Sequence, residues 1–286
     1  MTKRSKAKRK KRVVETKHSI YQKNYTQYRD YTDGESRAPR RGEKKSPCSE
    51  AERLRKRAIN MKSSAEKVSW LIEQIFEKQD LHVVLKFTTE GGRLQLNDKQ
   101  ITAILARFAR LLRADYKARG NELKYIFVFE RGEETGAKKR HVHMIVNSVS
   151  RPKDSAERKM WAICDDETPR IMRERWEKAQ KWGGCAGIGA AYVKPIISKG
   201  TIGDYLRKEF YDTLYNLDYL DGGIHKRYSR SKNLIMPKAY YEDIDTGETI
   251  LETSYAGMAL DADSYSCNID NRGNITESAR FYDIGE

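Results

Sequence analysis

Two histidines stand two residues apart in the stretch RHVHMIVN, a spacing at which their imidazoles could ligate a metal ion. The apolar residues around them predict a β-strand at 140–147. Because alternate residues of a strand lie on one face, His141 and His143 are expected on the same side of a sheet. A preceding strand is predicted at 124–130, and its pairing with 140–147 across the intervening loop brings Glu130 beside His141.

These three residues form a mixed nitrogen and oxygen donor set for a divalent cation with open coordination positions. Such a set suits Mn²⁺ or Mg²⁺ better than structural zinc, which prefers thiolates and closed tetrahedral sites. The alternative is a pair of surface histidines on a strand, satisfied by water or by backbone groups. The chain has five histidines, and the presence of two of them in one strand near a carboxylate favours the metal site.

A second group of candidate residues lies on a helix predicted at 201–217, TIGDYLRKEFYDTLYNL. Its apolar residues recur every three or four positions and define a packing face, whereas Tyr205 and Lys208 share a different face. A phenol beside an ammonium group suits attack on a phosphodiester, because the phenol is the nucleophile and the cation stabilises phosphate charge or helps to ionise the phenol. With 17 tyrosines in the chain, the alternative is an ordinary amphipathic helix with a solvated polar face. Tyr211 and Tyr215 are expected to serve packing or DNA stacking.

A basic and aromatic run, HKRYSRSK at 225–232, follows that helix. It offers cations for phosphate contact and a ring for base stacking, as a site for single-stranded DNA would need. The alternative for this run is a solvated basic loop. The candidate DNA-binding residues are Lys226, Arg227, Tyr228, Arg230 and Lys232.

These residues need a sheet and helices to position them, and apolar periodicity predicts both. Apolar residues at helical spacing cover 49–76 and 98–118, and polar helical sequence fills much of 153–182. An apolar run at 81–88, LHVVLKFT, predicts a strand that precedes the two strands above. Strand, helix, strand, strand and helix in this order predict an α+β fold, an antiparallel sheet with helices packed on one face.

Charge changes along the chain and predicts three regions. The net charge is +15, and a strongly basic balance indicates an acidic partner such as nucleic acid. Residues 3–12 are nearly all Lys or Arg, so 1–48 is expected to be a disordered basic arm that adds phosphate contacts without sequence choice. The folded domain is expected over 49–235, and 236–286 is expected to be a loosely structured acidic tail.

The composition also bears on the compartment. No apolar run reaches the roughly 20 residues of a membrane-spanning helix, and no apolar segment follows the basic N-terminus, so neither a membrane partner nor a secretory signal is expected. The four cysteines are scattered without a CxxC pair, which predicts neither a disulfide framework nor a zinc ribbon. We therefore expect a cytoplasmic protein.

Taken in chain order, these motifs resemble the HUH endonuclease superfamily, in particular the single-tyrosine rolling-circle replication initiators of plasmids, phages and small circular DNA viruses. That family shows an apolar strand ending in Thr, then a His-hydrophobic-His strand, then a YxxK helix. The matching segments here are 83–88 (VVLKFT), His141-Val142-His143 and Tyr205-Leu206-Arg207-Lys208. The family commonly takes its third metal ligand from an acidic residue on the strand before the histidines, and Glu130 fits that position. The resemblance covers roughly residues 80–235.

The resemblance implies a nuclease domain of HUH/RRM-like fold that nicks single-stranded origin DNA. Tyr205 would attack the scissile phosphate, leaving a 3′-hydroxyl for a host polymerase and a 5′-phosphotyrosine on the protein, and attack by a 3′-hydroxyl would rejoin the strand. Lys208 and the divalent ion, Mn²⁺ or Mg²⁺, would assist. A separate helicase is implied as well, because the chain has no GxxxxGK[ST] loop. The setting implied is the cytoplasm of a bacterial host cell.

Two features depart from the family pattern. Lys86 interrupts the first motif, to which we therefore assign only a structural role. Positions 201 and 209 are Thr and Glu, so no second tyrosine lies four residues from Tyr205, and this favours a one-tyrosine enzyme. Two alternatives stay open. A relaxase or single-strand transposase of the same superfamily shares the chemistry, whereas a non-catalytic basic nucleic-acid-binding protein would carry these residues incidentally.

Overall fold

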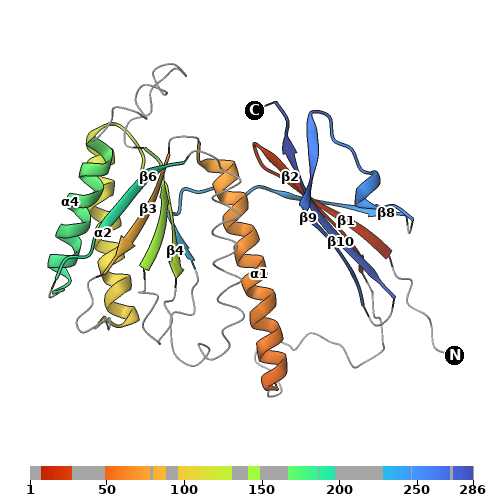
Figure 1. Cartoon of the computed structure of the whole chain (residues 1–286), viewed down its shortest axis with the longest axis horizontal. Helices are drawn as coiled ribbons and strands as arrows, with labels where there is room; N and C mark the ends of the chain where they lie inside the picture. Colours follow the sequence, from red (N-terminus) through yellow and green to blue (C-terminus); the bar gives the residue numbers. More distant parts are fainter. Residues whose placement is uncertain are drawn as a thin grey trace. The chain divides into compact units, whose positions relative to one another are not determined.

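The computed structural model divides the chain into two compact units, each with its own antiparallel sheet (Figure 1). One unit joins Met1–Leu54 to Met236–Glu286, and the other is Arg55–Ile235. The architecture is α+β, as the sequence predicts, with a second sheet that the sequence does not predict. The structure describes residues 8–27, 49–77, 80–87, 96–130, 141–148, 167–185, 187–196, 228–245, 247–270 and 273–285.

The sheet of the Arg55–Ile235 unit has five strands in the order β6-β3-β5-β4-β7. The strands are β3 (Leu81–Lys86), β4 (Tyr125–Glu130), β5 (His141–Val146), β6 (Ala191–Pro195) and β7 (Tyr228–Arg230). The central three lie within the predicted strands at 81–88, 124–130 and 140–147, where β-branched and aromatic residues favour a pleated, half-buried surface. The histidine strand β5 is at the centre of the sheet.

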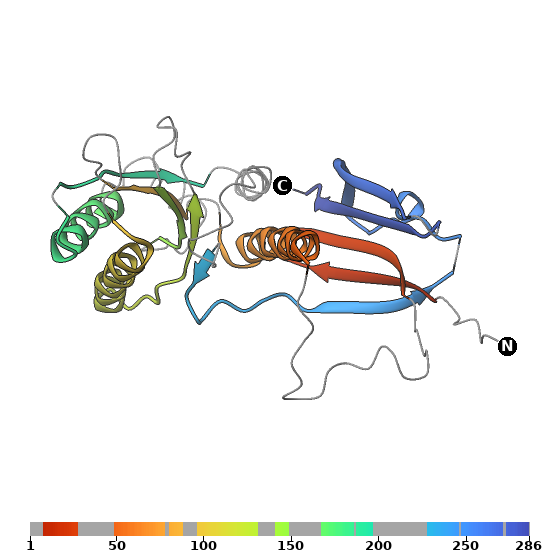
Figure 2. The same ribbon diagram turned by 90° about the horizontal axis from the view of Figure 1, so that it is seen from below.

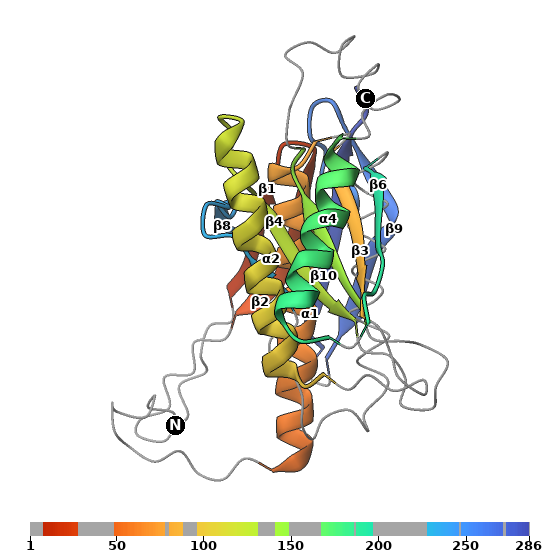
Figure 3. The same ribbon diagram turned by 90° about the vertical axis from the view of Figure 1, so that its left-hand side faces the viewer.

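Helices α2 (Asp98–Ala118) and α4 (Glu167–Trp182) cover one face of this sheet (Figures 2 and 3). Their contact with the strands is a dense aromatic core. The Trp176 ring of α4 lies 5.2 Å from the Phe87 ring and 5.3 Å from the Phe108 ring, both in edge-to-face geometry. Such pairs add to the stabilisation that apolar burial already gives, so this face of the sheet is held firmly against its helices.

Helix α1 (Glu50–Ile75) differs from the expectation of helices on one face, because the part within this unit lies on the other side of the sheet (Figures 1 and 3). The strand residues on that side are also apolar, and Ile126 and Ile145 are fully buried. Helix α1 contributes Leu71 and Ile72, which are fully buried as well. A sheet with apolar residues on both faces needs cover on both, which explains the difference.

The other unit is a five-stranded sheet built from both ends of the chain, in the order β8-β1-β2-β10-β9. Its strands are β1 (Lys8–Glu15), β2 (Ser19–Gln27), β8 (Ala239–Ile244), β9 (Met258–Ile269) and β10 (Ile275–Asp283). A short 3₁₀ turn, η2 (Ile250–Glu252), packs on one face through Ile250, which is fully buried with Phe281.

The prediction of a disordered basic arm over 1–48 is therefore wrong for Lys8–Gln27, and the prediction of a loose acidic tail over 236–286 is wrong for its strands. The basic residues of the first region pair with acidic residues of the second. In β1, Lys8 and Lys10 form ion pairs with Asp243 of β8, and these lysines lower the pKa of the Asp243 carboxyl. Because the partners are far apart in sequence, no local pattern signals them.

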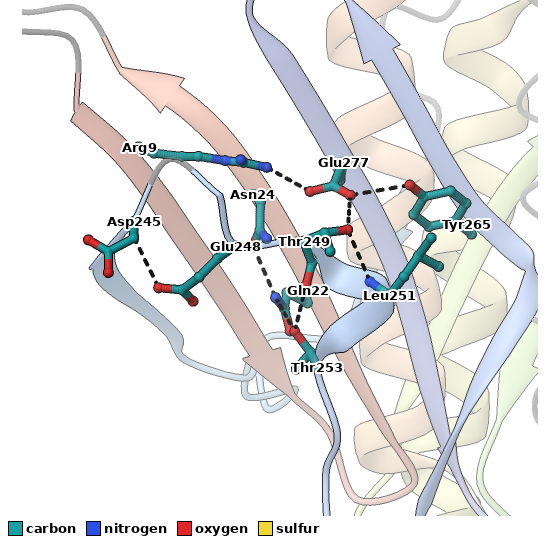
Figure 4. A network of polar contacts seen from close by, with 10 residues as sticks. All are labelled: Arg9, Gln22, Asn24, Asp245, Glu248, Thr249, Leu251, Thr253, Tyr265 and Glu277. Carbon is teal, nitrogen blue, oxygen red and sulfur yellow. Dashed lines mark hydrogen bonds and ion pairs between the residues drawn. The ribbon is translucent and has the colours of Figure 1, made fainter.

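A buried polar network ties the strands of this sheet together (Figure 4). The side chain of Glu277 on β10, only 4% exposed, accepts hydrogen bonds from Arg9 Nη2 at 2.7 Å and Thr249 Oγ1 at 2.7 Å. Tyr265 on β9 donates to the same carboxylate at 3.2 Å. The network thus joins β1, β9, β10 and the η2 turn, and it satisfies a carboxylate that would be costly to bury alone.

Among the helices that the structure describes, none combines the length and the apolar character that a bilayer crossing requires.

Candidate functional site

The histidine strand β5 presents its alternate residues to two different environments. Val142, Met144 and Val146 belong to the core beneath α2 and α4. His141 and His143 therefore lie on the opposite face of the sheet, as the spacing predicts. Their ring centroids are 4.8 Å apart with the ring planes at 62°. Two imidazoles on one sheet face are thus adjacent, and the pair can approach a common point above the strand.

The two histidines differ in burial. His143 is 1% exposed, whereas His141, one pleat nearer the end of the strand, is half-buried. His143 lies on the central strand between Val84 of β3 and Val128 of β4, on the side of the sheet where α1 lies. The site therefore has a buried end at His143 and a more accessible end at His141.

Glu130 ends β4, and the backbone register pairs it directly with His141 (Figure 1 shows the two strands). Directly paired residues of antiparallel strands share a face and have Cβ atoms about 4.5–5.5 Å apart. The backbone thus places position 130, the predicted third ligand, beside His141. The side chain of Glu130 lies outside the described part of the structure.

A third histidine, His82 on β3, reaches the same face and was not among the residues singled out from the sequence. Its Nε2 lies 2.9 Å from Nδ1 of His143 in a hydrogen bond, and the two rings are stacked with centroids 5.2 Å apart and planes at 19°. The signal was present in the strand pattern, because His82, Val84 and Lys86 alternate on one face of β3. The His-x-His motif does not include His82, which is far from His141 in sequence.

The electrostatic surroundings keep His82 neutral. Burial lowers the pKa of His82 from its ordinary value of 6.5 to about 4, with further lowering by His143, Lys194 and His141. At neutral pH its ring therefore carries one N–H donor and one acceptor nitrogen. The hydrogen bond to His143 joins two imidazoles of which one donates and the other accepts.

Basic and aromatic side chains flank the histidines on the β6 side of the sheet. Lys86 is the register partner of His141, and its Nζ lies 4.7 Å from the centroid of the Tyr192 ring on β6. Tyr192 is 51% exposed, so its ring is open to solvent beside the cation. An exposed ring with a neighbouring ammonium group suits contact with the bases and phosphates of a single strand.

The predicted DNA-binding run is only partly described. Tyr228 and Arg230 belong to β7 and pair with Val128 and Ile126 of β4, so they lie on the histidine face rather than in a loop. Arg230 donates a hydrogen bond to the Leu234 carbonyl, which fastens the adjoining turn. Lys232 is exposed in that turn, whereas Lys226 and Arg227 lie outside the described residues.

The predicted nucleophile and its helper, Tyr205 and Lys208, also lie outside the described residues. The structure therefore brings together His141, His143, His82 and position 130, and it does not place the tyrosine relative to them. Within the described side chains, which leave out that of Glu130, no group of three or more His, Cys, Asp or Glu is arranged to hold a metal ion. The donors present nevertheless fit a divalent ion in type, since imidazole nitrogens with one carboxylate are a common ligand set.

Comparisons of the chain with protein-family models, with curated proteins and with solved structures found no match.

Proposed function

We propose that this protein is a metal-dependent endonuclease of the HUH type, with an HUH/RRM-like nuclease domain in the Arg55–Ile235 unit. It nicks and rejoins single-stranded origin DNA as a rolling-circle replication initiator. The observation that carries the proposal is the adjacency of His141 and His143 on one face of a central strand, with Glu130 paired to His141 in register. A strand order that separated these positions would have argued against a common site.

The proposed chemistry uses residues with separate tasks. Glu130, His141 and His143 hold a Mn²⁺ or Mg²⁺ ion, and when bound this ion supplies Lewis-acid stabilisation of phosphate charge. The Tyr205 oxygen forms a bond to phosphorus as the bond to the 3′-oxygen breaks, giving a 5′-phosphotyrosine and a free 3′-hydroxyl. A phenol with a pKa near about 10 is mostly protonated at neutral pH, so it must lose its proton during attack, and Lys208 favours that loss.

The surroundings of the histidines support a single-stranded substrate. Cations and aromatic rings lie on the same sheet face as the histidines. On one side they are Lys86 and Tyr192, and on the other they are Tyr228 and Arg230. Cations contact phosphates without regard to sequence, and rings stack on unpaired bases. A duplex would offer no exposed base faces to these rings.

The test is covalent capture from a pool of single-stranded oligonucleotides with a randomised segment, in the presence of Mn²⁺. DNA that stays on the protein after denaturation is sequenced, and the peptide that carries it is mapped by mass spectrometry. We expect an adduct that disappears with a chelator and in the H141A/H143A variant. Failure of the protein to form any adduct, while it still binds the oligonucleotides, would favour the non-catalytic binding protein instead. The recovered sequence separates an initiator from a relaxase or transposase, since it identifies the replicon origin, the transfer origin or the element end.

A further inference from the structure

His82 lies on a different strand from the His141–His143 pair, yet its ring makes a direct polar contact with His143. Its Nε2 is 2.9 Å from His143 Nδ1. The register pairs His82 with Ile145, so His143 is its diagonal neighbour on the same face. Diagonal neighbours on a sheet are within reach only of long or aromatic side chains, and the stacked rings here, with centroids 5.2 Å apart, use that reach.

The contact constrains which nitrogen of His143 can bind a metal ion. A neutral imidazole has one N–H donor and one acceptor nitrogen, and a metal binds the acceptor. Nδ1 of His143 faces His82, so a metal shared with His141 would be bound by His143 Nε2. His143 must then carry its proton on Nδ1 and donate it, which makes Nε2 of His82 the acceptor.

We propose that His82 is a positioning residue that accepts the Nδ1–H of His143, thereby fixing the ring orientation and the tautomer in which His143 Nε2 can bind the metal. This inference rests on the proposed function, because it assigns a task within the proposed metal site. A metal-bound histidine generally donates the N–H of its second ring nitrogen to a carboxylate, a carbonyl or water, which orients the ring. Here an imidazole takes that place, held on a strand that packs directly against β5.

The first experiment reads the tautomers directly and needs neither metal nor DNA. In the full chain labelled with ¹⁵N-histidine, nuclear magnetic resonance of the ring nitrogens gives the tautomer of each of the five histidines. Single His→Gln variants assign the signals. We expect His143 and His82 both to carry their proton on Nδ1 at neutral pH. A His143 that carries its proton on Nε2 would overturn the proposal, whatever the protein does to DNA.

The second experiment compares H82Q with H82L in Mn²⁺ binding and in formation of the covalent DNA adduct. The amide oxygen of Gln can accept from His143, whereas Leu cannot. We expect H82L to weaken Mn²⁺ binding by about ten- to hundredfold, as is typical when a ligand loses its orienting partner, and H82Q to recover most of that loss. H18L is the matched control, because it makes the same change in the other unit and should leave Mn²⁺ binding unaltered.

The outcomes distinguish failure of the proposed function from failure of the role of His82. A wild-type protein that binds no Mn²⁺ and forms no adduct sinks the proposed function, and the tautomer measurement still decides the His82–His143 contact. Wild-type binding that H82L leaves unchanged, with the fold of both variants verified by their melting curves, overturns the role of His82. Loss of binding in H82Q as deep as in H82L makes His82 a metal ligand itself, which also overturns the positioning role.

Discussion

At the scale of single residues, the proposed function depends on one hydroxyl group. Tyr205→Phe removes only that oxygen, so folding and binding of single-stranded DNA should persist while the covalent adduct disappears. Lys208→Ala should slow adduct formation by about a hundredfold or more without abolishing it, since a charge-stabilising group assists attack but does not perform it. Denaturing gels that separate free protein from the protein–DNA adduct measure both effects.

The local competitors for that role are Tyr211 and Tyr215, which lie on the same predicted helix. Their Phe variants serve as controls and should form the adduct at the wild-type rate. DNA mapped to either of these tyrosines would keep the enzyme class and reject Tyr205 as the nucleophile.

Tyr255 gives the structure a measurable pH dependence. Its hydroxyl donates to Gln22 Oε1 at 2.6 Å, and partial burial, with smaller effects of Glu242 and Glu15, raises the pKa of Tyr255 from 10.0 to about 12. The folded protein therefore keeps this proton at pH values where the unfolded chain has lost it. The resulting stabilisation is complete below pH 10 and is lost as the pH rises through about 12.

We expect the difference in unfolding free energy between the wild type and Tyr255→Phe to shrink over that window. Urea titrations of both proteins at a series of alkaline pH values measure it, and other tyrosines and lysines cancel in the comparison. A difference that does not change with pH would show that Tyr255 ionises equally easily in the folded and unfolded states.

The histidines that could be predicted from the sequence differ from the one that could not in their separation along the chain. His141 and His143 are near one another along the chain, so strand periodicity alone places them on one face. His82 joins them only through the register between β3 and β5, which pairs residues some sixty positions apart. Strand periodicity puts His82 on one face of β3, but the residue of β5 that it meets on that face depends on how the two strands align.

At the scale of elements, the unit that joins Met1–Leu54 to Met236–Glu286, here called the terminal unit, should lose stability when the buried pair of Arg9 on β1 and Glu277 on β10 is broken. The two side chains are only 9% and 4% exposed. Glu277→Ala leaves the guanidinium buried without its carboxylate, and removal of one partner of a buried pair costs about 3–5 kcal/mol of unfolding free energy. Hydrogen exchange of peptides from β1 and β10, measured over a series of denaturant concentrations, gives this loss.

A more exposed ion pair in the same sheet provides the control. Lys11 of β1 and Glu242 of β8 lie 3.6 Å apart, and their side chains are 20% and 62% exposed. Exposed pairs contribute about 0–1 kcal/mol, so Glu242→Ala should change stability little. Equal losses in the two variants would mean that the buried network of Figure 4 does not stabilise the unit more than a surface contact does.

Elements with local signals were predictable from the sequence, and those defined by distant partners were not. Helix α2 was predicted with both of its ends from its apolar spacing, and the structure adds a capping box of Asn97 and Gln100 at its start. Strand β1, by contrast, reads KRKKRVVE and lacks the alternation of a half-buried strand. Its charges become compatible with a sheet only because β8, more than two hundred residues later, supplies carboxylates beside them.

At the scale of the whole molecule, the two units should respond differently to loss of the C-terminus. Ending the chain after Asn274 removes β10, which pairs with both β2 and β9. We expect backbone amides of Lys8–Gln27 to lose protection from hydrogen exchange while those of Leu81–Lys86 keep it. Mass spectrometry of exchanged peptides from the full and shortened chains gives both readings.

Two results would contradict this expectation. Protection that persists in Lys8–Gln27 would show that β1 and β2 hold together without β10. Protection lost in Leu81–Lys86 as well would show that the histidine sheet depends on the terminal unit for its stability.

The pairing of β1 and β2 with β8 and β10 in one sheet has a consequence for how the protein is made. On the ribosome, β1 and β2 are synthesised before β8 and β10 and can form a hairpin, but the outer edge of each stays unpaired until β8 and β10 have been made. Until then the growing chain has two unpaired strand edges, which are templates for pairing with other chains. We expect the Lys and Arg residues of β1, which repel their counterparts on neighbouring chains, to oppose such pairing until β8 supplies the carboxylates with which they form ion pairs.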